Sequence, residues 1–221
     1  MAERFAAILR DGVVVEAGSG EGYGAAILRD AGARAVVALE HDEPAARHAA
    51  AAYPSVSTSR ANLAAMPVAA ASADLLVCLQ VVEHLWDLRG FLADCVRVLR
   101  PGGVAVVSTP NRPVFSPGLG RRERPTNPFH VEELDSEQLD ERLRTAVFAD
   151  VDVLGLRHGP RIEAWESLRG TGIVAAQISV VTGAGPVPAD LASFVAGVTV
   201  DDFTIGYADG AQDLVAVAVA P

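Results

Sequence analysis

The segment best suited to chemistry is a glycine-rich turn, Glu-Ala-Gly-Ser-Gly-Glu-Gly, from Glu16 to Gly22. It directly follows the apolar run Val13 to Val15, as a turn after a buried strand would. Glycines at alternate positions let the backbone bend sharply and remove each Cβ that would keep a flat, polar ligand away. Glu16 and Glu21 flank the turn, and two carboxylates suit a cationic ligand better than a pyrophosphate. The segment therefore predicts a binding site for a positively charged ligand.

Two other interpretations of this turn stay open. Glycine-rich turns also serve only to pack a strand against a helix, and this chain has 20 glycines. The spacing Gly20-x-Gly22-x-x-Ala25 also fits the looser G-x-G-x-x-A pattern of dinucleotide-binding dehydrogenases.

Two histidines are candidate general bases, because imidazole exchanges a proton near neutral pH. His84 follows a continuous apolar run, so we expect it at the C-terminal end of a strand, where open α/β sheets bind ligands. The alternative for His84 is a structural hydrogen bond to a backbone carbonyl beside Trp86. His130 follows a long aperiodic segment and can share or replace this role, or instead cap the turn at Glu132 and Glu133.

Apolar runs bounded by turn residues alternate with amphipathic stretches along the chain, a pattern typical of βαβ units in a parallel sheet. The predicted strands are Val13 to Val15, Ala35 to Leu39, Ser55 to Ser59, Ala73 to Gln80, Val104 to Ser108, Val151 to Leu156 and Leu214 to Val219. The predicted helices are Tyr23 to Asp30, Glu43 to Ala52, Phe91 to Leu99, which Pro101-Gly102-Gly103 ends, and Leu134 to Leu143, with Ser136 as N-cap. The pattern predicts a Rossmann-like α/β fold with a doubly wound, mostly parallel, seven-stranded sheet.

The length predicts a single domain over residues 1–221. Residues 110–130 are rich in Pro, Arg, Gly and Asn without periodicity, which is typical of a lid-like loop. Residues 157–205 are mixed and punctuated by Gly and Pro, and we expect a small cap insertion there. Solvated loop charge is the expected state of Arg112, Arg121, Arg122 and Arg124.

The composition excludes several classes of protein. Half of the residues are hydrophobic, yet no apolar run reaches the roughly 18–20 residues that span a bilayer. The net charge is −10, which would repel nucleic acid phosphates. Cys78 and Cys95 give neither a disulfide framework nor the spacing of a zinc site. With no secretion signal visible, we expect a cytoplasmic protein that binds neither nucleic acid nor membrane.

The chain resembles the class I S-adenosylmethionine-dependent methyltransferases, whose first motif is an acidic residue, a spacer and G-x-G-x-G, as in Glu16 to Gly22. Glu40 ends the second predicted strand, where family members bind the ribose hydroxyls, and Asn62 lies in the segment that passes the adenine edge. Arg97 to Ser108 is similar to the helix-turn-strand that leads into the family's fifth strand. The resemblance extends in order through residues 12–110, and it implies a sheet whose last strand is antiparallel.

This resemblance implies S-adenosylmethionine as cofactor and S-adenosylhomocysteine as product. The sulfonium and amino groups of that cofactor are positively charged, which is consistent with acidic residues beside the glycines. The residues expected at the cofactor are Glu16, Gly18, Ser19, Gly20, Gly22, Tyr23, Glu40, His41, Asn62, Leu63 and Gln80.

A narrower resemblance, over nearly the whole chain, is to the actinobacterial sugar O-methyltransferases, such as the 1-O-methyltransferase of mycobacterial methylmannose polysaccharide synthesis. The segments that carry it are Gln80 to Asp87, Ser108 to Arg112, Ser116 to Gly118, Asn127 to His130 and His158 to Arg161. Family members carry an additional N-terminal segment, whereas here one short helix is expected before the first strand.

The catalytic residues that we expect are His84, His130 and Glu83. In related methyltransferases a Glu-His pair at the position of Glu83 and His84 holds a divalent cation. Magnesium prefers oxygen ligands and keeps several waters, so one carboxylate with sugar hydroxyls would suffice to hold it. A Mg²⁺ ion can thus be accommodated but is not expected, and no metal ligand is assigned.

We therefore expect an S-adenosylmethionine-dependent O-methyltransferase that acts on a sugar or oligosaccharide hydroxyl, mannoside-like. The expected partner is a small-molecule or oligosaccharide substrate, and a homodimer is compatible with the sequence. The alternatives are a small-molecule N- or O-methyltransferase of secondary metabolism and a catalytically silent module that binds the cofactor.

Overall fold

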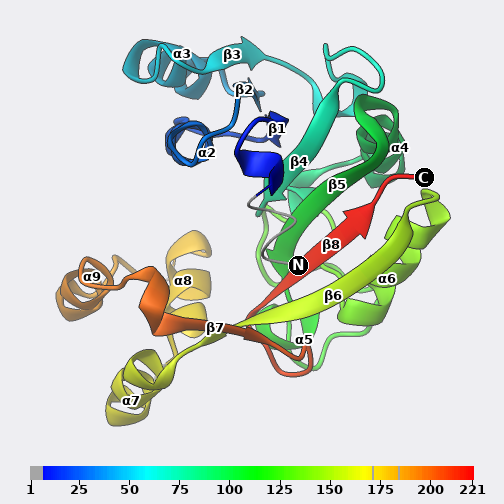
Figure 1. Ribbon diagram of the computed structural model, residues 1–221. Coiled ribbons are helices and arrows are strands. Elements are labelled where there is room, and N and C mark those ends of the chain that lie inside the picture. The colour runs from blue at the N-terminus through cyan, green and yellow to red at the C-terminus, as the bar shows by residue number, and fades with distance from the viewer. Residues whose placement is uncertain (1–6, 171, 184) are drawn as a thin grey trace. The chain divides into compact units, whose positions relative to one another are not determined.

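One mixed sheet contains the eight strands of the described residues, in the order β3-β2-β1-β4-β5-β8-β6-β7 (Figure 1). The computed structural model describes residues 7–170, 172–183 and 185–221, so part of the short helix expected before the first strand lies outside them. The strands are β1 (Val13–Ala17), β2 (Ala35–Glu40), β3 (Ser57–Arg60), β4 (Ala73–Leu79), β5 (Leu99–Pro110), β6 (Ala149–His158), β7 (Phe203–Gly206) and β8 (Asp213–Val219). The α-helices are α2 (Tyr23–Asp30), α3 (Glu43–Ala52), α4 (Leu88–Val98), α5 (Arg112–Phe115), α6 (Ser136–Thr145), α7 (Pro160–Arg169), α8 (Ile173–Val181) and α9 (Ala189–Val195). Three short 3₁₀ turns are η1 (Leu63–Ala65), η2 (Val82–His84) and η3 (Val200–Asp202).

Strand β1 is hydrogen-bonded in parallel to β2 on one edge and to β4 on the other. Its apolar residues Val14 and Val15 are fully buried, as expected for an inner strand of a parallel sheet. The chain leaves β1 toward β2 and β3 on one side and continues through β4 and β5 on the other. The C-terminal ends of β1 and β4 therefore border a topological switch point, where open α/β sheets bind ligands.

Two antiparallel strand pairs lie at the β5 end of the sheet, β5 with β8 and β6 with β7. The Gly102 N–H donates to the Ala220 carbonyl at 3.0 Å, and the Asn111 N–H donates to the Gln212 carbonyl at 2.9 Å, so β8 runs opposite to β5. Strand β7 pairs antiparallel with β6. The predicted Rossmann-like, mostly parallel sheet with an antiparallel last strand is thus confirmed. It has one strand more than expected, because β7 is short and lies in a segment that shows no strand periodicity.

The described chain forms two compact units that share β5, α6, β6 and β8. The first unit comprises residues 7–108, 140–152 and 216–221 and contains β1 to β4 with α2, α3 and α4. The second unit comprises residues 109–139 and 153–215 and contains α5, α7, α8, α9 and β7. None of the helices in the described ranges is long and apolar enough to cross a bilayer.

The turn expected at Pro101-Gly102-Gly103 lies within β5 instead. Helix α4 ends at Val98 and the strand begins at the next residue. The pairing of β4 with β5 shifts register across this segment, and Gly102 has a φ of +74°. The helix-breaking residues therefore form an irregular stretch of strand rather than a separate turn.

Helix α6 begins with a cap different from the one that the sequence suggested. The Gln138 N–H donates to Asp135 Oδ1 at 2.9 Å, and the Asp135 N–H donates to Gln138 Oε1 at 3.1 Å. This reciprocal pair is a capping box, so Asp135 and not Ser136 caps the helix.

Two residues after helix α6 ends at Thr145, a valine lies in the left-handed region of backbone space. Val147 has a φ of +65°, its N–H donates to the Arg144 carbonyl, and the Phe148 N–H donates to the Leu143 carbonyl. These two bonds are those of a Schellman motif, whose left-handed position usually holds glycine. A β-branched residue there is strained, and the Val147 side chain, at 64 % exposure, recovers little by burial.

Replacing the strained residue, Val147→Gly, is expected to raise the free energy of unfolding by about 1 kcal/mol, because the left-handed conformation costs a side chain roughly that much. Urea denaturation followed by circular dichroism measures this change. The neighbouring Ala146→Gly is the matched control: its φ is not positive, so it should lower stability. A Val147→Gly protein no more stable than wild type would contradict this account of the helix end.

Candidate functional site

A cavity of about 660 Å³ opens where the parallel strands β1, β2 and β4 end, within the first compact unit. Its volume is in the range of small-molecule and cofactor sites. It is lined by Gly18, Gly20, Glu40, His41, Asn62, Leu63, Ala64, Leu79, Gln80, Val81, His84, Leu85, Trp86, Asp87 and Phe91. The switch point of the sheet thus carries a site of the expected kind.

The glycine turn after β1 is held tightly on one side and open on the other. The N–H groups of Gly18 and Ser19 both donate to the Leu39 carbonyl, at 2.8 and 3.0 Å. Gly18 has a φ of +82°, and a Cβ there would overlap the side chain of Val81. Gly20 has a φ of +51°, and a Cβ there would meet nothing within 4 Å. Gly20 therefore leaves open space on the cavity wall.

Glu40 joins this turn to the end of β2. Its Oε2 accepts a hydrogen bond from the Gly20 N–H at 2.8 Å, and its Oε1 accepts one from the Asp42 N–H at 2.8 Å. Both carboxylate oxygens retain lone pairs for further donors such as hydroxyl groups. The structure thus brings Glu40 and the glycine turn together on one wall.

The cavity also contains a strained backbone position at the end of β4. Gln80 has a φ of +57°, and its N–H donates to the Ser108 carbonyl at 3.0 Å. Its side-chain Nε2 lies 3.2 Å from Ser108 Oγ. Non-glycine residues in this conformation cluster at functional sites, where the surrounding structure enforces them.

The remaining residues expected at the cofactor divide into two groups. His41, Asn62 and Leu63 lie on the cavity wall, and Asn62 Oδ1 also accepts the Ala64 N–H at the start of η1. Four candidates do not line the cavity: Glu16, Ser19, Gly22 and Tyr23. Gly22 packs against α3, since a Cβ there would lie 2.7 Å from Ala49 Cβ, and the Tyr23 side chain is exposed.

Several lining residues had not been singled out as ligand contacts, chiefly Val81, Leu85, Asp87 and Phe91. They follow β4 within a few residues of Gln80 and His84, so adjacency to those candidates was the only available signal. Asp87 also caps α4, because its Oδ1 accepts the Gly90 N–H at 2.8 Å.

Glu16 is a buried carboxylate whose charge lacks full compensation. It lies near the end of β1 beneath α2, and a Cβ on Gly24 would overlap its Oε1. Within the described ranges its Oε2 has no hydrogen-bond partner, and neither has the buried Ser19 Oγ. Burial raises the pKa of Glu16 to about 7, and a backbone hydrogen bond with Ala25 acts in the opposite direction.

His84 lies on the cavity wall next to a buried carboxylate. It ends η2, and its side chain is about half exposed, whereas Glu83 is buried. The distance from His84 Nε2 to Glu83 Oε1 is 3.8 Å, which is too long for a hydrogen bond. Trp86, with 91 % of its surface exposed, adds an apolar face to the same wall.

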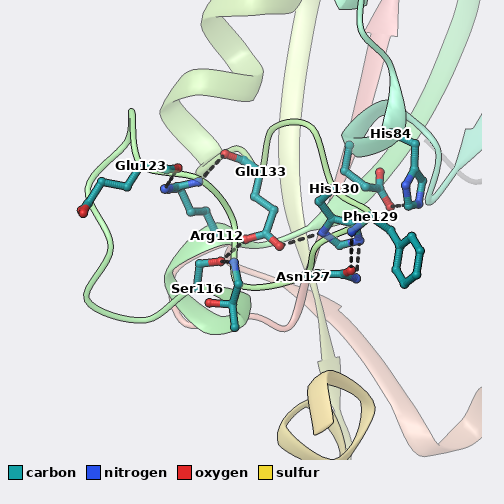
Figure 2. A network of polar contacts seen from close by, with 10 residues as sticks. His84, Arg112, Ser116, Glu123, Asn127, Phe129, His130 and Glu133 are labelled. Atoms are coloured by element: carbon teal, nitrogen blue, oxygen red, sulfur yellow. Dashed lines mark hydrogen bonds and ion pairs between the residues drawn. The ribbon is translucent and has the colours of Figure 1, made fainter. Parts of the chain in front are cut away.

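His130 belongs to the second compact unit, where it is buried in a polar network (Figure 2). Its Nδ1 lies 2.7 Å from Glu133 Oε1, and its Nε2 lies 2.9 Å from Asn127 Nδ2. Glu133 Oε2 accepts a hydrogen bond from Ser116 Oγ at 2.6 Å. The imidazole is thus held at both nitrogens.

Arg112 is not the solvated loop charge that the sequence suggested. It is buried, and its guanidinium donates to the carbonyls of Gly120, Glu123 and Glu133 (Figure 2). The loop of residues 110–130 turns back on this arginine, which explains its burial. Arg121, by contrast, is half exposed and pairs with acidic groups near α6.

The buried Glu16 predicts how the stability of the ligand-free protein depends on pH. Because its pKa in the folded state, about 7, exceeds the ordinary 4.5, its contribution is fully present below pH 4.5 and is lost as pH rises through 7. The slope approaches about 1.4 kcal/mol per pH unit when one proton is involved. In denaturation between pH 5 and 8, the Glu16→Gln protein should gain stability relative to wild type as pH rises. A Glu16→Gln curve that runs parallel to the wild-type curve over this pH range would contradict the assignment.

Sequence comparison places this architecture among known proteins. The model of a methyltransferase domain matches residues 15–107. A probable S-adenosylmethionine-dependent methyltransferase of Mycobacterium tuberculosis strain H37Rv is 45% identical over 214 residues, which cover 94% of this chain and 77% of that protein. A protein of the same description from Mycolicibacterium smegmatis is 46% identical over 213 residues, which cover 94% of this chain and 81% of that protein.

Solved structures show the same fold at much lower identity. An S-adenosylmethionine-dependent methyltransferase of Thermotoga maritima superposes with a TM-score of 0.64 at 17% identity, covering 99% of this chain and 86% of that one. A Mesorhizobium loti enzyme of that description gives 0.60 at 18% identity, covering 94% and 90%. Because the two mycobacterial relatives match this chain along nearly its whole length, the chain belongs to the class I S-adenosylmethionine-dependent methyltransferases, and S-adenosylmethionine is its cofactor.

Proposed function

We propose that the protein transfers the methyl group of S-adenosylmethionine to a hydroxyl of a sugar or oligosaccharide, mannoside-like. The observation that carries this proposal is the position of His84 on the wall of the cavity that also contains the glycine turn and Glu40. A neutral amine can attack a methyl group without losing a proton first, whereas a hydroxyl gains from a nearby base. A histidine at this site therefore favours an oxygen acceptor.

The cofactor-binding residues are proposed from the family motif and from the cavity. Gly20 leaves room on the wall, and Glu40 accepts the ribose hydroxyls with its carboxylate oxygens. Gly18, His41, Asn62, Leu63 and Gln80 complete the wall. From behind the glycine turn, Glu16 adds negative charge near the cationic ligand. Ser19, Gly22 and Tyr23 support the shape of the turn.

Bound S-adenosylmethionine supplies an electrophilic methyl group on a positively charged sulfur. With the cofactor bound, His84 would take the proton of the acceptor hydroxyl, and the cofactor would supply the methyl group to that oxygen. The buried Glu83 stabilises the resulting imidazolium across 3.8 Å. His130 shares this proton-accepting role or replaces His84 in it.

The wider organisation is proposed on the same basis. The chain acts as one methyltransferase domain in the cytoplasm, with residues 110–130 as a lid-like loop and residues 157–205 as a small cap. The net charge of −10 disfavours nucleic acid as a partner, and a membrane is not proposed as a partner either. A small-molecule N- or O-acceptor of secondary metabolism is the alternative substrate class, and a silent cofactor-binding module is the non-enzymatic one.

Loss of cofactor affinity is expected for Glu40→Ala and for Gly20→Val, measured by titration calorimetry with S-adenosylhomocysteine. The first removes the acceptor proposed for the ribose, and the second fills the open wall and strains a left-handed backbone. Glu43→Ala and Gly102→Val are matched controls: the first removes a carboxylate outside the cavity, and the second strains a left-handed glycine with equal free space elsewhere. Unchanged affinity for S-adenosylhomocysteine in both test variants would refute the proposed position of the cofactor.

For His84→Ala we expect cofactor affinity to persist while turnover on a mannoside acceptor falls by ~10²–10⁴-fold, the range for a lost general base. Initial rates at saturating cofactor measure this. His48→Ala, on the exposed face of α3, should retain wild-type rates. Near-normal turnover in His84→Ala would move the base to His130, and cofactor binding without turnover on a broad panel of sugars would support the silent module.

A further inference from the structure

We propose that Glu133 is a positioning residue that holds His130 in the tautomer protonated at Nδ1, so that Nε2 carries the lone pair that accepts a proton. The inference rests on the proposed function, in which His130 shares proton acceptance with His84. All the groups that carry it lie in the second compact unit (Figure 2).

The orientation of the Asn127 amide is fixed by the backbone. The Phe129 N–H donates to Asn127 Oδ1 at 3.0 Å, so the oxygen of the amide must face Phe129. The amide nitrogen then faces His130 Nε2, at 2.9 Å. An amide NH₂ group is only a donor, and Nε2 must therefore be the acceptor.

This contact decides where the proton of His130 lies. A neutral imidazole has one N–H and one lone pair, so an unprotonated Nε2 requires the proton at Nδ1. Nδ1 lies 2.7 Å from Glu133 Oε1, a short distance typical of a charge-assisted bond. The two contacts agree on a single tautomer.

Glu133 is in turn held so that it can only accept. Ser116 Oγ accepts the Thr126 N–H at 2.9 Å, which directs the hydroxyl proton of Ser116 to Glu133 Oε2 at 2.6 Å. Glu133 is 0% exposed, and both of its oxygens now have donors. A buried carboxylate so satisfied gives His130 a fixed ring orientation and a fixed negative charge.

The chemical consequence concerns the fate of the acceptor proton. If an acceptor hydroxyl takes the place of the Asn127 N–H at Nε2, as the proposed function requires, its proton would pass to Nε2, and the bound cofactor would supply the methyl group to its oxygen. The resulting imidazolium keeps its Nδ1–H bond to Glu133, whose charge offsets the new positive charge. The Glu133 side chain thus orients the His130 ring and stabilises its imidazolium form without touching the substrate.

Two nearly isosteric variants test this. Glu133→Gln presents either an oxygen or an N–H to Nδ1 and has no charge, so it no longer imposes the tautomer. Asn127→Asp places a carboxylate oxygen against Nε2, which forces a proton onto that nitrogen. Ser116→Ala is the matched control, because it weakens the same network but leaves the Glu133 contact to Nδ1.

The readouts are long-range ¹H–¹⁵N spectra of the histidine rings in the full chain, assigned with His130→Gln, together with steady-state rates. In wild type and in Ser116→Ala we expect the His130 ring to be protonated at Nδ1 and unprotonated at Nε2. In Glu133→Gln we expect a mixture of the two tautomers, and in Asn127→Asp we expect Nε2 to be protonated. We expect kcat to fall ~10²–10⁴-fold in the last two with acceptor KM within about twofold, as for a misoriented base.

Several results would overturn the inference. A wild-type ring protonated at Nε2 would do so, as would Glu133→Gln with unchanged spectrum and rate. Equal losses of rate and melting temperature in Ser116→Ala and Glu133→Gln would assign the network to stability alone. If wild type methylates no hydroxyl acceptor, the proposed function fails, and the ring spectra still decide the tautomer by themselves.

Discussion

The parallel pairing of β1 on both edges is the constraint that places the cavity. Glu16 on β1 aligns with Ala38 on β2 and with Val77 on β4, so the three strands end at one edge of the sheet. The turns that follow them must then meet, which brings together the glycine turn, Glu40 and Gln80. A slip of one residue in β1 would move Glu16 to the opposite face and separate Gly20 from Glu40. The site is thus a property of strand register as much as of its side chains.

This register explains why the glycine turn and Glu40 lie together at one edge of the sheet. The apolar runs of β1, β2 and β4 identify inner parallel strands, and the residue after each run falls at the C-terminal edge. The hydrogen bond from the Gly20 N–H to Glu40 is a direct consequence of that arrangement. The short polar β3, Ser57–Arg60, lacks such a run, yet its position follows once β2 is placed.

The second unit was much less predictable, for physical reasons that particular residues show. Helix α8, Ile-Val-Ala-Ala-Gln-Ile-Ser-Val-Val, is apolar almost throughout, so it has no polar face to reveal a helical period. Arg112 lies in a segment rich in Pro and Gly, and such a position predicts a solvated side chain. Backbone carbonyls 8 and 11 residues later instead accept hydrogen bonds from its guanidinium. The spacing of His130 and Glu133 was visible, whereas the amide orientation of Asn127 depends on a backbone turn that spacing does not encode.

Three carboxylates, all buried or partly buried, show how the protein treats acidic groups. Glu133 has a donor on each oxygen, and Glu40 accepts two backbone N–H groups. Glu16 lacks such compensation, and burial raises its pKa accordingly. Burial first, and then the carboxylates of Glu83 and Glu16, raise the pKa of the Cys78 thiol on β4, which indicates a negative field at that edge. Retaining an undercompensated acidic group there costs stability when it is ionised, and a cationic ligand is the partner that would recover that cost. The electrostatics of the first unit are therefore compatible with a cationic ligand near the end of β1.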